Sequence, residues 1–427
     1  MFRMQTGIET GLSWAMLFAL VLVVVHGSAA HADGLDLADA EVMALEDDPG
    51  VQRIESSRQA LEELSVAANQ LPDPVVKMGL MSLPTDTFDL GQEAMTQVQV
   101  GVVQKFPRGR SRELRSAQYD LRSDGLGDVA RDRSLQAVLA VREDFVEVVK
   151  QRELGRINRE AIAAFEEVEQ ITRDYYATGR VAQQDALQAA VELAKVEDRA
   201  ARIAQEEEQA RSRLSTWIGA AAFSGFEEGW PDLAEPADVA TLEQRLPAHP
   251  RLAALQKNIA AAETGVELAR QRYKPEFGVD LTYGGRRGDN PDGRPRSDLL
   301  SLMVVMDVPL FTRNRQDRVV AAQVAESSAA RFTLDDELRR MRGEIEFHVA
   351  GHRRLAERLA LFEGTLLPQA EFSSEASMNA YRSSLVDLTT LLRARITEFD
   401  LQLEHARLKA ELLKTRARLH YLAGESS

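Results

Sequence analysis

The chain has 427 residues, of which 44% are hydrophobic, so it is long enough to bury a large core or to form two or more domains. Its net charge of -15 argues against a nucleic-acid partner, because proteins that bind nucleic acids need a basic surface to neutralise phosphates. The absence of cysteine excludes disulfides, thiol nucleophiles, thiolate metal sites and the cysteine that anchors a bacterial lipoprotein.

Residues 1–32 have the features of a secretory signal peptide. Arg3 precedes an apolar run from Trp14 to Val25, and the small-x-small pattern Ala30-His31-Ala32 follows it. This run is shorter than the roughly 20 residues that a helix needs to span a bilayer. We therefore expect an exported chain that begins near Asp33, with a retained N-terminal membrane anchor as the alternative. No later apolar stretch is long enough for a membrane helix.

The rest of the chain contains an internal duplication. At an offset of 205 positions, the stretch from Tyr176 to Gly219 matches the stretch from Tyr381 to Gly424 without a gap. Eleven of the 44 positions are identical, which is well above chance. We expect a first repeat at 33–225, a linker between the repeats at 226–248 and a second repeat at 249–427. Each repeat is predicted to contain a helix, two strands and two long helices, in that order.

Helices are predicted at both ends of each repeat. The opening helices are expected at 51–70 and 252–273, where apolar residues recur at helical spacing before a proline. In the first repeat, 111–175 lacks proline and is expected to form one helix roughly 97 Å long, which indicates a coiled coil or a bundle. Apolar seams with coiled-coil spacing follow at 186–217 and 388–417, so each repeat is predicted to close as a helical hairpin. The tips of these hairpins are expected at 176–181 and 381–386.

Four strands of about ten residues are expected; the two of the second repeat alternate apolar and polar side chains clearly, whereas in the first repeat the alternation is weaker and 75–84 alternates poorly. The last of them is expected to run to Val308 and to end at Pro309. Strands of roughly 9–11 residues with one apolar face suit an outer-membrane barrel, and four strands in lipid must be joined by strands of other chains because open edges are excluded. Three chains would supply twelve strands. The residues predicted to face lipid are Val98, Val100, Val102, Val279, Leu281, Val304 and Met306.

Taken in this order, these features resemble the TolC-like outer-membrane efflux family. The motifs are Gln-x-Phe-Pro at 104–107, Pro-Leu-Phe at 309–311, Tyr-x-x-Gly at 176–179 and Leu-x-x-x-x-Gly at 214–219 and 419–424. The segment 309–316 is most similar to the heavy-metal branch, which works with resistance-nodulation-division pumps. The resemblance implies a mainly α fold with membrane β structure: a trimeric twelve-stranded outer-membrane β-barrel, with four strands per chain, continued by a long α-helical periplasmic tunnel.

The resemblance also implies a function and partners. The protein would be a passive conduit for export in the outer membrane and periplasm, docked to a periplasmic adaptor protein and an inner-membrane pump, with no cofactor. In the family the hairpin tips dock the adaptor, often through a Val-Gly-Leu turn that this chain keeps only in part. The matching tip residues are Thr178, Gly179, Arg180, Ser383, Ser384 and Leu385.

The family also closes its tunnel mouth with polar contacts between neighbouring hairpins. An Asp and a Tyr of that gate match Asp185 and Tyr381, whereas the acidic positions that ring the mouth match Thr390 and Arg393. The resemblance therefore predicts a gate of different selectivity at these four residues. The alternative is that they are ordinary exposed residues of the coiled coil.

Other candidate sites are weaker. His348 and His352 stand four apart on one helix face, but no third metal ligand is near in sequence, and no metal site is predicted. Clustered carboxylates lie on charged helical faces, and no phosphate-binding loop or catalytic triad occurs, so we do not expect an enzyme. The alternative to a conduit is a structural coiled-coil protein without a pore. The net acidity suggests tolerance of cations in the lumen but does not identify the cargo.

Overall fold

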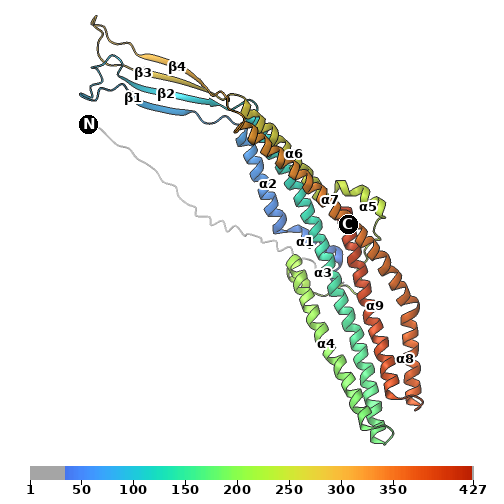
Figure 1. Ribbon diagram of the computed structural model, residues 1–427. Coiled ribbons are helices and arrows are strands. Elements are labelled where there is room, and N and C mark those ends of the chain that lie inside the picture. The colour runs from blue at the N-terminus through green and yellow to red at the C-terminus, as the bar shows by residue number, and fades with distance from the viewer. Residues whose placement is uncertain (1–33, 426–427) are drawn as a thin grey trace, which may run out of the picture.

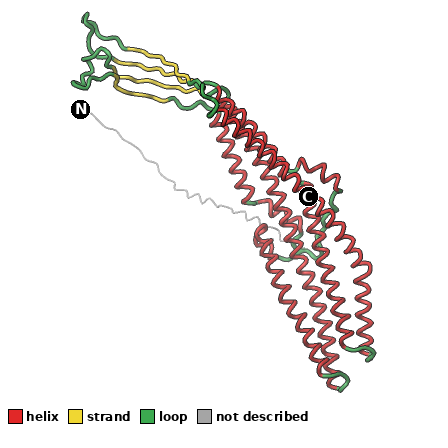
Figure 2. Tube along the Cα trace, viewed as in Figure 1, coloured by secondary structure: helices red, strands yellow, loops and turns green. Residues whose placement is uncertain are grey.

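The structure is a computed structural model that describes residues 34–425, so the predicted signal peptide lies outside the described residues. The molecule is elongated, with a four-stranded sheet at one end and long helices that run away from it (Figure 1). Helices make up nearly all of the remainder (Figure 2). Within 34–425, no helix combines the length and apolar character needed to cross a membrane.

The order of elements repeats along the chain. The first copy has an additional short helix, α1, and a second short helix, α5, lies between the copies. The boundaries of the predicted repeats remain a prediction. The elements are α1 (Leu37–Glu46), α2 (Pro49–Ala68), β1 (Val75–Met81), β2 (Gln97–Phe106), α3 (Ser111–Ala177), α4 (Gln183–Ile218), α5 (Val239–Arg245), α6 (Pro250–Arg270), β3 (Phe277–Gly285), β4 (Leu299–Met306), α7 (Gln316–Leu361), α8 (Leu367–Arg382) and α9 (Leu388–Ala423).

The opening helices of the two repeats begin in the same way. Pro49 and Pro250 occupy the first helical position, where a missing backbone N–H costs nothing. The residue before each proline caps the helix: Asp48 accepts a hydrogen bond from the N–H of Gly50, and His249 accepts one from the N–H of Arg251. The opening helices predicted at 51–70 and 252–273 are thus confirmed, with α6 extended by a 3₁₀ turn at 271–273.

The long helices of the two repeats differ. In the first repeat α3 is one helix of 67 residues, which confirms the prediction for 111–175. In the second repeat the corresponding length is divided into α7 and α8 by a π-helical turn at Phe362–Leu366. Pro368 follows this turn and has no N–H to donate to the carbonyl of Gly364, so the regular helical pattern cannot continue through it.

The helices form a layer that is one helix thick over most of its length. Beside the sheet the order is α2, α3, α6 and α7, and toward the hairpin tips it is α4, α3, α9 and α8. Buried apolar clusters fill the spaces between neighbouring helices. In α4 the buried residues Ala189, Val196, Ile203 and Ala210 recur every seven positions, which is the coiled-coil seam that the sequence indicates.

The sheet is antiparallel, with the strands in the order β1-β2-β3-β4. The strands contain 7, 10, 9 and 8 residues, so three of them are shorter than the predicted ten. The prediction that the last strand reaches Val308 is wrong by two residues, because β4 ends at Met306. The physical reason lies in Asp307, whose carboxylate accepts a hydrogen bond from the N–H of Glu276 and pairs with Arg108, so the chain turns toward the helices there.

Candidate functional site

One face of the sheet is almost entirely apolar. In the observed register Val76, Val102, Leu281 and Leu302 stand side by side across all four strands. At the far end Leu80 on β1 stands beside Val98 on β2. Most of these side chains are exposed; Leu302 and Val304, for example, are 69% and 62% exposed. The seven residues predicted to face lipid all lie on this face, and their contact with lipid remains a prediction.

The opposite face of the sheet carries the polar side chains, together with apolar ones such as Met303 and Val305 on β4. Lys77 on β1 pairs with Asp280 on β3, and the Thr282 hydroxyl donates to Asp280 at 2.7 Å. Gly101 lies between them on β2, and a Cβ there would come within 2.6 Å of Thr282 Oγ1. A side chain at position 101 would therefore separate this ion pair, so glycine is needed where the polar groups meet.

Charged residues gather where the strands meet the helices. Arg108 lies between β2 and α3; it pairs with Asp307 beyond β4 and lies 3.7 Å from Glu276, which precedes β3. Arg108 also donates to the carbonyl of Arg272 at 3.1 Å. These contacts tie the ends of three strands together at the transition to the helical layer.

The two hairpin tips lie at the same end of the molecule and contact each other (Figure 1). Gly179 and Ser384 have positive φ values of 73° and 56°, which allows the tight turn after α3 and after α8. Arg180 lies 4.0 Å from the ring centroid of Tyr175 and donates to the Ser384 hydroxyl at 2.8 Å. Leu385 is 78% exposed, and all six predicted docking residues are exposed.

The four predicted gate residues lie in two different environments. Tyr381 is buried, and its hydroxyl donates to the Thr172 hydroxyl of the other hairpin at 3.1 Å, because the Thr172 proton goes to the carbonyl of Val168. Burial raises the pKa of Tyr381. Asp185 accepts a hydrogen bond from the N–H of Ala182 at the start of α4, and no hydrogen bond joins it to Tyr381 within residues 34–425.

The remaining gate candidates lie on the surface of α9. Thr390 and Arg393 are exposed in the first two turns, and the N–H of Thr390 donates to the capping carboxylate of Asp387. The structure thus brings Tyr381 against the first hairpin but leaves Thr390 and Arg393 without such a contact among the described residues. Thr172 could not be recognised from the sequence, since a threonine within a long helix gives no local signal of its partner.

The histidine pair does not build a metal site. His352 lies 3.3 Å from a carboxylate oxygen of Glu235 and accepts a hydrogen bond from Arg416, whereas burial lowers the pKa of His348 beside Arg418. In the described part of the chain, no group of three or more His, Cys, Asp or Glu side chains could hold a metal ion.

Comparison with known proteins indicates a family. A family model described as "Outer membrane efflux protein" matches residues 241–425, which include most of the predicted second repeat. This part of the chain is therefore similar to the outer membrane efflux protein family. No curated protein matches the sequence.

Solved structures of outer-membrane channels share the fold of nearly the whole chain. A membrane protein from Pseudomonas aeruginosa matches with a TM-score of 0.80 at 14% identity, covering 92% of this chain and 91% of that chain. The outer-membrane channel OprN matches with a TM-score of 0.77 at 15% identity, covering 91% and 89%. The outer membrane protein VceC of Vibrio cholerae matches with a TM-score of 0.76 at 17% identity, covering 92% and 97%.

These findings confirm the predicted family and fold class. At this low identity the structural likeness establishes the fold, and the family match at 241–425 supports the predicted role, a channel component of an efflux system in the outer membrane.

Proposed function

We propose that the protein is the outer-membrane channel of a tripartite efflux system, a passive conduit across the periplasm and the outer membrane. The observation that carries the proposal is the apolar face of the sheet. Its exposed valines, leucines and methionines would be costly in water and are suited to the hydrocarbon of a membrane. The polar face, with the Lys77–Asp280 ion pair, would then line the lumen.

The open edges of the layer support assembly with other copies. Among the described residues, β1 and β4 each pair with one strand only, and in lipid such an edge leaves backbone groups unsatisfied. Large exposed apolar side chains mark the edge helices as well: Leu64 on α2, Leu187 on α4, Phe332 on α7 and Phe372 on α8. Closure by a homotrimer would pair β4 with β1 of the next copy and would give twelve strands.

The hairpin tips are the proposed docking point for the other components. An inner-membrane pump, of the resistance-nodulation-division type, would supply energy and choose the cargo, so the conduit needs no catalytic group. A periplasmic adaptor would bind the exposed tips, including Arg180 and Leu385. The predicted gate at Asp185, Tyr381, Thr390 and Arg393 belongs to the same end of the tunnel.

The test is to purify the full chain in detergent, determine its mass and record current after insertion into a planar lipid bilayer. A trimer that conducts in discrete steps is the expected result. A monomer that dissolves without detergent and forms no pore would instead support a structural coiled-coil protein.

Tip docking is tested separately by single cysteines, which is possible because the chain has no native cysteine. A cysteine at Arg180 or Leu385 should crosslink to the adaptor, and a cysteine at the distant position Gly155 should not. Equal crosslinking from all three positions would contradict docking at the tips.

A further inference from the structure

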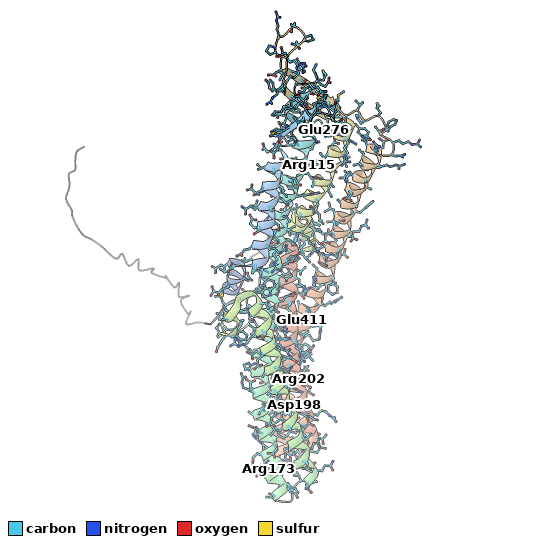
Figure 3. All side chains as sticks on the ribbon, turned by 90° about the vertical axis from the view of Figure 1, so that its left-hand side faces the viewer. Arg115, Arg173, Asp198, Arg202, Glu276 and Glu411 are labelled. Atoms are coloured by element: carbon cyan, nitrogen blue, oxygen red, sulfur yellow. The ribbon has the colours of Figure 1, made fainter. Side chains whose placement is uncertain are left out.

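A cavity of about 850 Å³ lies where the sheet meets the helices, between α3, α6 and the start of α7. Arg115 and Glu276 mark its position near the sheet end of the helical layer (Figure 3). One acidic residue and five arginines are among its lining residues: Glu276, Arg108, Arg112, Arg115, Arg272 and Arg315.

The positive charge of this cavity is largely uncompensated. Arg108 is paired with Glu276 and Asp307. Within residues 34–425, none of the other four arginines forms an ion pair with a carboxylate, and Arg112 donates instead to the backbone carbonyl of Asn69. A chain with a net charge of -15 therefore carries a concentrated excess of positive charge at one level of the molecule.

Two helix N-termini add to this positive potential. α3 begins at Ser111 and α7 begins at Gln316, and at neither start does a capping side chain accept a hydrogen bond from a backbone N–H. The N–H groups of Ser111 and Asp317 donate to backbone carbonyls instead. The helix dipoles place partial positive charge at the same level, although each first turn also holds one acidic residue, Glu113 in α3 and Asp317 in α7.

The cavity adjoins a hollow on the polar face of the sheet. This second hollow shares Arg108 and Glu276 with the cavity and is also lined by Lys105, Asp280 and Asp307, which follow the polar register. Glu263 and Glu267 line a different hollow, on the opposite face of α6. If the polar face lines the lumen, the arginines face the lumen too.

We propose that these arginines form a basic collar in the lumen, at the level where barrel becomes tunnel, and that the collar binds anionic solutes bearing carboxylate or phosphate groups. The planar guanidinium group suits both anions, because its parallel N–H donors match two oxygens at once. The inference rests on the proposed conduit, in which three copies would place three such cavities around one passage. The collar would give the passage a local preference for anions within an otherwise acidic protein.

The experiment measures the reversal potential of single channels in a KCl gradient and the block of current by added citrate or inorganic pyrophosphate. Arg112→Gln, Arg115→Gln and Arg272→Gln are combined in one variant, and the corresponding lysine variant keeps the charge. The matched control is Arg331→Gln, which removes an arginine beside Glu263 on the opposite face.

We expect the glutamine variant to lower the chloride-to-potassium permeability ratio by about threefold or more, because the collar and a permeating ion would lie within roughly one Debye length of each other. Anion block should weaken in the same variant, whereas the lysine variant and Arg331→Gln should behave like the unmodified protein. Arg115→Gln alone, at an exposed position, should shift the ratio in the same direction if the triple variant does not assemble. Block by citrate alone would restrict the ligand to carboxylates, and block by pyrophosphate alone would restrict it to phosphates.

A conducting channel whose ion preference and anion block are unchanged by the glutamine variants would overturn the collar. An unmodified protein that forms no channel at all would overturn the conduit itself. The two failures are therefore distinguishable.

Discussion

The corresponding helices α3 and α7 show how differently the two repeats are used. α3 buries 21 of its 67 residues, whereas α7 buries three of its 46. The reason is position: α3 has helices of this chain on both sides, and α7 lies at an edge of the layer. Yet the exposed surface of α7 includes large apolar side chains: Phe332 and Phe347 are 71% and 74% exposed. In the proposed homotrimer, these exposed side chains at the edge of one copy would be covered by the next copy.

The largest effect is expected in the centre of the layer. Phe165 of α3 is 2% exposed and packs against Phe399 of α9, with ring centroids 6.3 Å apart. Phe165→Ala should lower the free energy of unfolding by about 3–5 kcal/mol, because it removes a buried ring and leaves a cavity. Denaturant unfolding in detergent measures this. Phe372→Ala on α8, where the ring is 75% exposed, should change protomer stability by only about 0.5 kcal/mol. Similar losses in both variants would contradict the distinction between centre and edge.

The edge strand β4 allows a sharper test, since neighbouring residues lie on opposite faces. Val304→Arg should block insertion into the outer membrane, because a charge near the middle of the bilayer costs about 2–4 kcal/mol. Val305→Arg places the same charge on the polar face and should be tolerated. The amount of protein in the outer-membrane fraction reports both. Normal insertion of the Val304 variant would show that this face does not contact lipid.

The edge helix α7 should respond in assembly rather than in folding. Phe332→Ser should weaken the trimer by about 1.5–3 kcal/mol per subunit, the value of burying one phenylalanine side chain. Phe332→Leu retains most of the apolar area and serves as the control. Native mass spectrometry over a range of protein concentrations would follow dissociation. A trimer unaffected by the serine variant would place the interface elsewhere on the helix.

The same contrast explains what the sequence could predict. The helix at 111–177 was predictable, because a stretch without proline and with regular apolar spacing allows few alternatives. The apolar sheet face was predictable where alternation is strict, as in Val98, Val100 and Val102. The residues of β1 that belong to this face were not predictable, because Lys77 and Gly79 interrupt a run that is apolar on both faces.

Sites built from distant segments gave no local signal. The five arginines of the collar come from three stretches, around 108–115, at 272 and at 315, and each stretch alone resembles an ordinary charged helix terminus. The contact of Tyr381 with Thr172 joins residues 209 positions apart. The early end of β4 depends on the bond from Glu276 to Asp307, which the apolar run before Pro309 does not reveal.

The smallest expected effect concerns the helix caps, where the repeats use different side chains at equivalent positions. Asp48 caps α2, and its hydrogen bond from Arg133 holds the pKa of its carboxyl below the usual 3.8, so its stabilisation is lost only as pH falls below that value. His249 caps α6 through Nδ1, with Nε2 at 3.0 Å from the carbonyl of Tyr421. Burial lowers the pKa of His249 below 6.5, so the folded state disfavours the protonated ring that the unfolded chain adopts more readily.

The stabilisation by His249 is therefore present above pH 6.5 and decreases as pH falls from 6.5 to the lower pKa of the folded state. Between pH 7 and pH 5 the second repeat should lose stability by about 1 kcal/mol, the value of one helix cap, while the cap at Asp48 is unaffected. His249→Asn preserves a capping acceptor without a titrating ring and should flatten this part of the unfolding profile, whereas Asp48→Asn should leave its slope unchanged. A profile that keeps its slope in the His249 variant would assign the pH dependence to another group, and the difference between the two caps would then have no consequence for stability.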